Sequence, residues 1–510
     1  MNHVLIAALF SSLPACAAMA EGPVPLDLIG IRPVSARPSS VSKIAFTTER
    51  GPAAKPPDTL QNLTEDQLQA LADFLVPDKN IPPRNFDNAL LHRLAQALSA
   101  VDMRYKRPIP KAEWDRLIAE MRETFTARNG RPETALLSAE QWEQSINDML
   151  RGFMKKLDDP YALFMDRRET KYFKSLFDRK GFTGIGVSIV KVAEGVKISS
   201  ILPGSPAGKA GFTLGDVITA IDGVPTKDQS LDTIAERLQE PVGFPVTIRI
   251  ERLGSPVLMT RAAIRMPDTF SKITATGIGY VYFSVFSDNI DRLIFNEIDK
   301  LCDMGATKLI IDVRANSGGM LTMADSIASE FLNDGDVIES TKRQDRLSSR
   351  ARTRGRGRYF GMPLAIIING DSASASEALA AALQHHKKAI VVGSQSYGKA
   401  SFQMPLPIVV PESDAQNAAV MDYRKDGTML MFTEGGWYPP DERSIEGVFD
   451  PAAGRNIPGS GGIVPDQIVE LSQEDDEKIM TGLRTQLSTQ IPSQVVDLQL
   501  DRAIEVLQRP

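Results

Sequence analysis

Residues 364–403 read LAIIINGDSASASEALAAALQHHKKAIVVGSQSYGKASFQ, and the pattern in this stretch predicts an α/β arrangement. The apolar run Leu364–Ile368 has the length and β-branched content of a buried strand, and the turn-forming residues Asn369–Asp371 end it. The Ala- and Leu-rich residues 377–383 predict a helix, and residues 389–392 predict a second buried strand. Two parallel strands joined by one crossover helix bring their carboxyl ends together. We therefore expect an α/β sheet in which the loops after both strands lie side by side.

Three serines, Ser372, Ser374 and Ser376, lie where the first of these strands gives way to the helix. Free backbone N–H groups and the positive end of the helix dipole point at such a junction, and both stabilise a developing oxyanion. A nucleophilic serine would suit this position. A short Ser/Ala run before a helix is, however, more often only an N-cap. The residue that could act as base decides between these interpretations.

Histidine is a poor candidate for that base. The chain has 4 histidines: His3 in a segment expected to be removed, His92 in a polar helical region, and His385 and His386 at the far end of the predicted helix. With a rise of 1.5 Å per residue, the last two lie about 15 Å or more from Ser374. A lysine can do the same work if burial in an apolar site lowers its pKa enough to leave it neutral. Lys399, in the loop after the second strand, is the candidate.

The spacing of these residues resembles the signature of the C-terminal processing peptidases, also called tail-specific proteases, which are Ser-Lys endopeptidases. The run SASASE at Ser372–Glu377, the Gly-Lys pair ending at Lys399, and Gln403 carry the likeness. The resemblance implies that Ser374 is the nucleophile, that Lys399 is the base 25 residues later, and that Gln403 helps to hold the lysine. The sequence departs from the family at Ala400, where a second glycine is usual, and we do not expect this change to abolish activity.

The region before this stretch continues the α/β pattern. Strands are predicted over 278–286 and 308–313, and helices over 288–304 and 321–331. The turn NSGG that follows the second of these strands resembles the family's second motif, in which a glycine N–H completes the oxyanion hole. We assign Gly318 or Gly319 to that role, together with the N–H of Ala375. Two glycines at this position could also simply end the strand, but an oxyanion hole needs donors from two loops.

A separate pattern over residues 181–256 resembles a PDZ domain. The elements PGSPA at 203–207 and GDVI…IDG at 215–223 carry this likeness. Such domains bind a peptide C-terminus: N–H groups of a glycine-containing loop hold the carboxylate while the ligand adds a strand to the sheet. The loop would consist of Gly184, Ile185 and Gly186. Taken alone, a G-x-G pattern is usually only a tight turn.

The N-terminus predicts export. Residues 1–20 form a short apolar run that ends in Ala18-Met19-Ala20, which fits a signal-peptide cleavage pattern. The residues Leu13-Pro14-Ala15-Cys16 also resemble a lipoprotein processing box, but the proline before the alanine is atypical. Lipidation of Cys16 is therefore a less favoured alternative to cleavage of a signal peptide. We therefore expect a periplasmic or otherwise exported protein. Of the 2 cysteines, only Cys302 would remain, which excludes an intramolecular disulfide.

The predicted fold class is multidomain α/β, since 510 residues argue for two to four domains. The predicted segments are a signal peptide (1–20), a Pro-rich linker (21–61), an N-terminal helical region (62–180), a PDZ domain (181–256), an α/β peptidase core (265–470) and a C-terminal helical tail (471–510). Asp158-Asp159-Pro160-Tyr161, at the end of the helical region, resembles a further family element. We interpret the basic stretch 342–358 as a solvated loop and residues 448–460 as a local insertion. Residues 462–466 are predicted to form a strand. Residues 497–508 are predicted to form an amphipathic helix for docking or dimerisation.

These observations predict an exported serine endopeptidase. A net charge of −6 and a pI of about 5.5 give no sign of nucleic-acid binding, and no His/Cys/Asp/Glu cluster has ligand spacing, so we expect no metal or other cofactor. The expected partners are protein substrates with flexible, apolar C-termini, while an adaptor lipoprotein and a homo-oligomer stay open. The alternative is a non-catalytic PDZ scaffold that binds protein C-termini. The intact Ser374, Lys399 and Gln403 count against that alternative.

Overall fold

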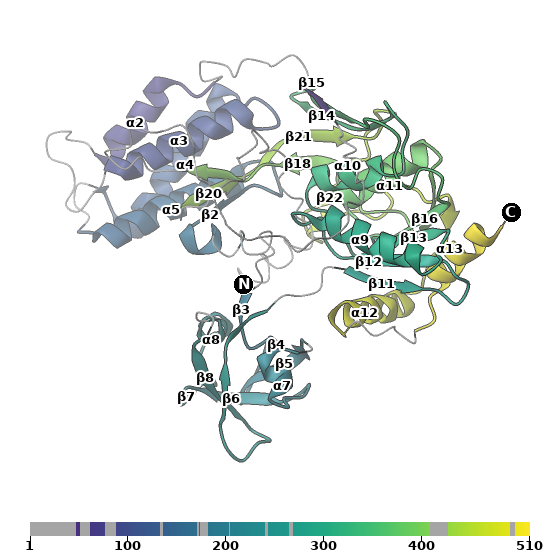
Figure 1. The fold of residues 1–510 in the computed structure, drawn as a ribbon. Coiled ribbons are helices and arrows are strands. Elements are labelled where there is room, and N and C mark those ends of the chain that lie inside the picture. The colour runs from purple at the N-terminus through teal and green to yellow at the C-terminus, as the bar shows by residue number, and fades with distance from the viewer. Residues whose placement is uncertain are drawn as a thin grey trace, which may run out of the picture.

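The computed structural model describes residues 47–50, 62–76, 88–132, 136–170, 173, 182–202, 204–239, 243–264, 269–408, 427–489 and 495–509. Figure 1 shows three units: a helical unit, a smaller β-rich unit, and a larger α/β unit that ends at the C-terminus. The expected signal peptide and most of the expected linker lie outside the described residues. None of the helices within those ranges combines the length and apolar content needed to cross a bilayer.

A six-stranded sheet forms the centre of the α/β unit. Its strands, in spatial order, are β11 (Thr269–Ile273), β12 (Gly279–Phe283), β13 (Leu309–Asp312), β16 (Leu364–Ile368), β17 (Ala389–Gly393) and β24 (Gln467–Ile468). Only the β11–β12 pair is antiparallel. Helix α11 (Ala375–His385) joins β16 to β17, and these two strands are parallel neighbours. The predicted strand–helix–strand unit is therefore confirmed, and no strand forms over 462–466.

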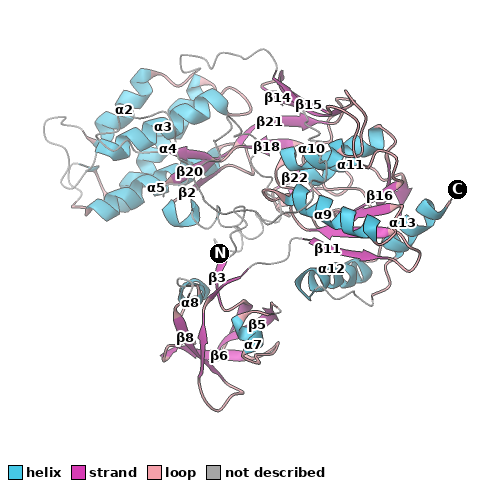
Figure 2. Cartoon of the chain, in the orientation of Figure 1, coloured by secondary structure: helices cyan, strands magenta, loops and turns pink. Residues whose placement is uncertain are grey.

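Helices cover both faces of this sheet (Figure 2). One face packs against α9 (Ile290–Asp303), α10 (Leu321–Ser329) and α11, and the other against α12 (Gln473–Thr489) and α13 (Leu498–Gln508). Alternate residues of β16 point to opposite faces, so Ile366 belongs to the first core and Ile367 to the second. Burial on both faces explains why the strand is apolar throughout. The buried Ala503, Val506 and Leu507 of α13 lie in the second core, so this amphipathic helix packs one face against the sheet, and docking or dimerisation through its other face stays a prediction.

A second, antiparallel sheet carries residues that the sequence analysis assigned to loops. Its order is β1 (Thr47–Arg50), β15 (Arg346–Arg352), β14 (Val337–Arg343), β21 (Thr433–Tyr438) and β18 (Ser401–Gln403). Most of the stretch 342–358 is therefore a β-hairpin with its turn rather than a solvated loop, and the predicted linker contributes a strand at 47–50.

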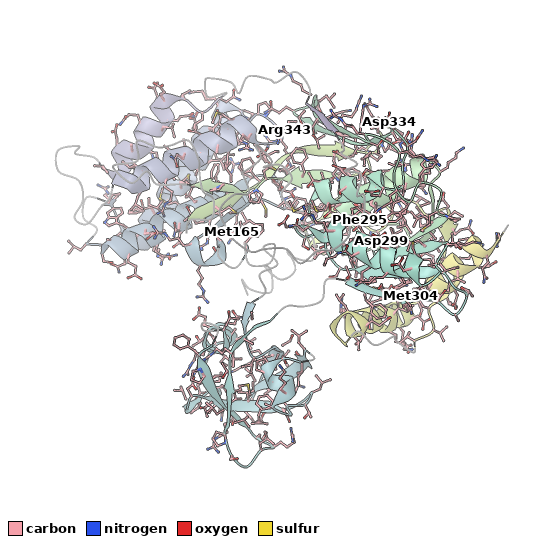
Figure 3. The ribbon with its side chains drawn as sticks, in the orientation of Figure 1. Met165, Phe295, Asp299, Met304, Asp334 and Arg343 are labelled. Atoms are coloured by element: carbon pink, nitrogen blue, oxygen red, sulfur yellow. The ribbon has the colours of Figure 1, made fainter. Side chains whose placement is uncertain are left out.

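Ion pairs explain how this basic hairpin fits into a sheet. Lys342 and Arg350 both pair with Glu442, the former at 3.3 Å. Arg343, labelled in Figure 3, pairs with the buried Glu434 at 3.0 Å. The same carboxylate also pairs with Arg104 of the helical unit at 2.7 Å, so Glu434 connects the second sheet to that unit.

The helical unit is built from α2 (Glu65–Leu75), α3 (Asn88–Arg104), α4 (Lys111–Asn129) and α5 (Ala139–Lys156). A capping box formed by Thr64 and Gln67 begins α2. A small sheet of β19 (Leu406–Ile408), β20 (Thr428–Met431) and β2 (Leu163–Met165) completes the unit. Phe164, Ile408 and Leu430 of these strands are buried in the core that the four helices share. Strands from the segment 265–470 thus complete a unit that was predicted to end at residue 180.

The smaller unit contains the sheet β4 (Val187–Val192), β5 (Gly195–Ile201), β6 (Val217–Ile221), β8 (Pro245–Ile250) and β9 (Val257–Thr260), with β7 (Val224–Pro225) beside β6. The remaining elements are β3 (Phe182–Gly184) paired with β10 (Ala262–Ile264), α7 (Pro206–Lys209) and α8 (Leu231–Leu238). Among the described strands, β4 pairs only with β5, so β4 is an edge strand. The Nζ of Lys191 donates to the carbonyls of Thr226, Lys227 and Gln229 just before α8, which ties β4 to that helix.

The predicted insertion 448–460 contains the two-stranded hairpin of β22 (Phe449–Asp450) and β23 (Arg455–Asn456). The Nδ2 of Asn456 donates to the carbonyl oxygens of Tyr397, at 3.3 Å, and Gly398, at 2.6 Å. The hairpin therefore supports the loop that leads to Lys399.

Candidate active site

Ser374 precedes the first residue of α11 and is 1% exposed. Its backbone has φ 56° and ψ −114°, a strained conformation for a residue with a side chain. The hydroxyls of its two neighbours bind the adjacent loop: Ser372 donates to Val313 O at 2.7 Å and Ser376 to Asn316 O at 2.8 Å. The hydroxyl of Ser374 donates no hydrogen bond to any described residue. Two of the three serines are therefore structural, and the middle one keeps its proton available.

Lys399 follows β17 and is fully buried, at 0% exposure. Its Nζ donates to Gln403 Oε1 at 3.3 Å and lies 2.9 Å from the centroid of the Tyr161 ring. Within the described residues, no carboxylate forms an ion pair with it. Burial lowers the pKa of Lys399 to about 7, although the negative charges of Glu446, Asp159 and Glu377 oppose this shift. A substantial fraction of the lysine is therefore neutral near pH 7 and able to accept a proton.

One buried carboxyl group holds the backbone of Ser374 beside that of Lys399. Glu377 Oε2 accepts the N–H of Ser374 at 2.7 Å and the N–H of Lys399 at 2.8 Å. Its Oε1 accepts the N–H of Gly398 at 2.7 Å and the hydroxyl of Ser396 at 2.5 Å. Burial raises the pKa of Glu377 to about 7, and the four donors oppose that shift. The sequence analysis quoted Glu377 only as part of a motif, yet it joins the two loops.

No hydrogen bond connects Ser374 Oγ to Lys399 Nζ in the described structure. Such catalytic hydrogen bonds are often long in enzymes without substrate and shorten in the complex. The structure therefore places both side chains, buried, at the carboxyl edge of adjacent parallel strands and leaves each without a competing strong partner.

The loop after β13 distinguishes between the two glycines considered for the oxyanion hole. The N–H of Gly318 donates to Asn316 Oδ1 at 3.0 Å, so it is already engaged. The N–H groups of Gly319 and Ala375 have no acceptor among the described residues. Gly318 has φ 102°, and a Cβ on it would lie 2.8 Å from Ser374 Cβ. Gly318 thus allows the loop to approach the nucleophile, and Gly319 is left as the donor.

Three further residues near the lysine were not assigned a role from the sequence. Tyr161 covers Lys399 with its ring, and Asp159 and Thr433 lie behind Gln403, connected to it by hydrogen bonds. The only signal in the sequence was the element Asp158–Tyr161, which resembled the family without indicating a function.

The loop Gly184–Gly186 lies in the smaller unit, apart from this site (Figure 1). Ile185 is buried in that unit's core, and its carbonyl accepts the N–H of Ala207 at 2.9 Å. Gly186 has φ 80° and its carbonyl accepts the N–H of Leu202 at 2.9 Å. The loop enters the edge strand β4 directly.

The other positions weighed from the sequence lie elsewhere. His385 and His386 are at the carboxyl end of α11, where His386 Nε2 lies 2.8 Å from Val337 O. His92 belongs to α3, and His3 is outside the described residues.

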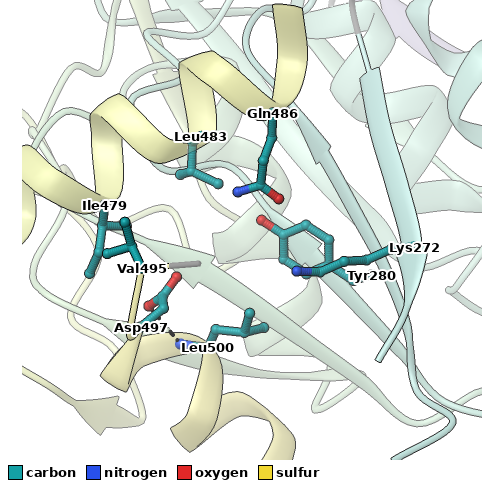
Figure 4. A pocket seen from close by; sticks show the side chains of 8 residues that line it. All are labelled: Lys272, Tyr280, Ile479, Leu483, Gln486, Val495, Asp497 and Leu500. Atoms are coloured by element: carbon teal, nitrogen blue, oxygen red, sulfur yellow. Dashed lines mark hydrogen bonds between the residues drawn. The ribbon is translucent and has the colours of Figure 1, made fainter. Parts of the chain in front are cut away.

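A water-sized pocket lies under α12 and α13, on the face of the sheet opposite α11 (Figure 4). It is lined by Lys272, Tyr280, Ile479, Leu483, Gln486, Val495, Asp497 and Leu500. It includes none of the predicted site residues.

Comparisons with known proteins match two regions of the chain. Residues 277–468 match the family model of peptidase family S41, and residues 197–252 match that of the PDZ domain. The chain thus has one region that matches peptidase family S41 and another that matches the PDZ domain, and it is similar to carboxy-terminal-processing proteases. The resemblance to C-terminal processing peptidases and the predicted fold class are thereby confirmed.

Curated relatives of this chain carry names that fit these matches. It is 29% identical over 337 residues to a "Carboxy-terminal-processing protease" of Bartonella bacilliformis, covering 64% of this chain and 69% of the relative. It is 31% identical over 301 residues to a "Probable CtpA-like serine protease" of Staphylococcus haemolyticus, covering 58% of this chain and 57% of the relative. The chain thus spans less than two thirds of the second relative. Among solved structures, the photosystem II D1 C-terminal processing protease is 23% identical, with a TM-score of 0.43 over 76% of this chain and 94% of that one.

Proposed function

We propose that this S41 peptidase is an exported serine endopeptidase that cleaves peptide bonds with a Ser374–Lys399 dyad and recruits substrates by their C-terminal tails. The observation that carries the proposal is the fully buried Lys399, with a pKa lowered to about 7, at the same sheet edge as a serine that donates no hydrogen bond. A solvated lysine would stay charged at neutral pH and could not act as a base.

The proposed reaction forms and breaks one acyl-enzyme. Ser374 Oγ attacks the peptide carbonyl carbon while its proton passes to the neutral Nζ of Lys399. The carbonyl oxygen becomes an oxyanion and accepts hydrogen bonds from the N–H groups of Gly319 and Ala375. Lys399 then gives the proton to the leaving amine, and the peptide C–N bond breaks. Water attacks the ester, Lys399 takes a proton from it, and the proton returns to Ser374 as the acid product leaves.

The smaller unit supports the proposed recruitment of substrate tails. Strand β4 has a free edge on which an extended peptide can add as a strand, and the loop Gly184–Gly186 begins it. Val187 and Ile189 on β4 are half-buried against the PDZ core, so part of each side chain remains accessible to an apolar tail. The proposed substrates are therefore proteins with flexible, apolar C-termini.

The proposed export rests on the sequence of residues 1–20 alone, which lie outside the described part of the chain. A fusion of residues 1–30 to a reporter enzyme that is active only after export tests it directly. Retention of the reporter in the cytoplasm would contradict export.

The central experiment compares the parent protein with Ser374→Ala and Lys399→Ala on a folded protein that carries a flexible apolar tail. We expect the parent to cleave and both variants to be inactive, while a His385→Ala/His386→Ala double variant cleaves normally. Loss of activity in the histidine variant equal to that of Ser374→Ala would show that the base is not Lys399. Tail binding by the parent without any cleavage would instead favour the PDZ scaffold.

A further inference from the structure

A chain of buried hydrogen bonds extends from Lys399 to a carboxylate in the helical unit. Lys399 Nζ donates to Gln403 Oε1 at 3.3 Å, and Gln403 Nε2 donates to Thr433 Oγ1 at 3.0 Å. Thr433 Oγ1 donates to Asp159 Oδ1 at 2.9 Å, and Thr433 N–H donates to Asp159 Oδ2 at 2.6 Å. All four residues are at most 8% exposed. The chain therefore runs through the protein interior with little competition from water.

Asp159, at the end of this chain, determines which group donates and which accepts in each of its hydrogen bonds. A carboxylate only accepts hydrogen bonds, and Asp159 accepts three, the third from the N–H of Tyr161 at 3.1 Å. The single hydroxyl proton of Thr433 is used on Asp159, so Thr433 Oγ1 can only accept from Gln403. The amide of Gln403 must then turn its NH2 group toward Thr433 and its oxygen toward Lys399.

The orientation of the Gln403 amide matters because Lys399 is proposed to act when neutral. A neutral amine has two N–H donors and one lone pair, and the lone pair must receive the proton of Ser374. An amide oxygen facing Nζ accepts one N–H and leaves the lone pair free. The reversed amide would donate its own N–H to the lone pair and so block the base.

Asp159 also holds Tyr161, whose ring lies on another side of Lys399. Its Oδ1 accepts the N–H of Tyr161, and the ring of Tyr161 lies 2.9 Å from Lys399 Nζ, measured to the ring centroid. One carboxylate in the turn before β2 thus holds both the covering ring and the hydrogen-bond chain.

We propose that Asp159 and Thr433 are positioning residues that keep the lone pair of Lys399 free by fixing the orientation of the Gln403 amide. This inference rests on the proposed Ser374–Lys399 chemistry, but it can fail while that chemistry holds. If Ser374→Ala is inactive and Thr433→Val is fully active, only the positioning role is wrong. If Ser374→Ala is active, the proposed dyad itself is wrong.

The test is Thr433→Val, which keeps the shape of the side chain and removes the hydroxyl. We expect kcat to fall by about 100-fold, in the range that general-base catalysis contributes, with KM changed by less than about threefold. Thr433→Ser retains the hydroxyl and should restore most of kcat. Thr428→Val is the matched control, because Thr428 is equally buried, at 2%, and its Oγ1 has no hydrogen-bond partner among the described residues. It should retain the parent's kcat.

A double-variant cycle separates positioning from a structural effect. With Gln403→Leu in place, there is no amide to orient, so adding Thr433→Val should not lower kcat further. A further fall in that background, or a kcat for Thr433→Val equal to that of Thr428→Val, would overturn the proposal.

Asp159→Asn provides a second variant if Thr433→Val does not fold. On the Oδ1 side, the NH2 of an asparagine would face the Thr433 hydroxyl and reverse the chain; on the Oδ2 side, it would face the N–H of Thr433 and displace that residue. We expect a lower kcat across the pH range in a folded protein whose melting temperature falls, because one buried donor loses its acceptor. Full activity of a folded Asp159→Asn protein would contradict the proposal.

Discussion

Replacing Glu377 by glutamine tests whether this one side chain fixes the positions of Ser374 and Lys399 relative to each other. The carboxylate accepts four hydrogen bonds, from Ser374 N, Lys399 N, Gly398 N and Ser396 Oγ. A glutamine has one oxygen, so its NH2 group faces two of these donors whichever way it is turned. In the better orientation, the glutamine oxygen keeps the N–H groups of Ser374 and Lys399, and the NH2 group faces Ser396 and Gly398. The Ser396 hydroxyl can rotate to accept from this NH2 group, so only the N–H of Gly398 is left without an acceptor.

A buried backbone donor without an acceptor costs about 1–3 kcal/mol, and we expect the free energy of unfolding to fall by about that amount. We also expect kcat to fall by roughly 100-fold, because a displacement of about 1 Å at a reacting group has an effect of that size. Urea unfolding and cleavage of a tailed protein measure the two effects. Both are done at about pH 8.5, where Glu377 is ionised because its pKa is about 7.

The control is Glu442→Gln, which removes a half-exposed partner of Lys342 and Arg350. Exposed ion pairs contribute about 0–1 kcal/mol, so this variant should unfold close to the parent and cleave normally. If Glu377→Gln matched the parent in both urea midpoint and kcat, Glu377 would not hold the two loops together.

Three other predictions concern pH and recognition. Burial lowers the pKa of Lys399 to about 7, so kcat/KM should rise with pH through that value, and Lys399→Arg should be inactive throughout; a pH-independent profile would contradict this. Burial raises the pKa of Asp325 from 3.8 to about 8, so the folded state keeps a proton that the unfolded chain releases, and stability falls as pH rises from about 4 to 8. Asp325→Asn should therefore flatten the pH dependence of the urea midpoint, and an unchanged slope would refute the assignment. Gly186 has φ 80°, so Gly186→Trp should distort the PDZ loop and sharply reduce cleavage of tailed proteins. Cleavage of short peptides should change little, unless the PDZ domain also activates the protease. Equal cleavage of tailed proteins by variant and parent would show that the PDZ domain does not recruit substrate.

The strand–helix–strand unit around α11 could be predicted because its signals are local. The apolar runs at 364–368 and 389–392 and the Ala-rich helix between them carry their periodicity and turn residues in consecutive positions. The candidate base could be reached by excluding the histidines and by the family spacing. Neither route requires knowledge of contacts between distant segments.

The surroundings of Lys399 could not be predicted, because they come from distant segments. Thr433 and Asp159 are 274 residues apart in the chain, and no local pattern indicates that they meet. The choice between Gly318 and Gly319 also depends on a hydrogen bond to Asn316 that only the folded loop reveals. Likewise, the hairpin at β14 and β15 is stabilised by acids such as Glu434 and Glu442, which lie about 90 to 100 residues further along the chain.

The strands β19 and β20, which complete the helical unit, have a consequence for synthesis on the ribosome. The helices α2 to α5 emerge early, but their shared core stays incomplete until Phe164 can pack with Leu430. Thr433 comes shortly after Leu430, so the carboxylate of Asp159 cannot accept the hydrogen bonds from Thr433 until 274 further residues have been added. A growing chain therefore carries Ser374 and Lys399 before the hydrogen-bond chain behind the lysine exists, and these contacts form only after Thr433 has been added.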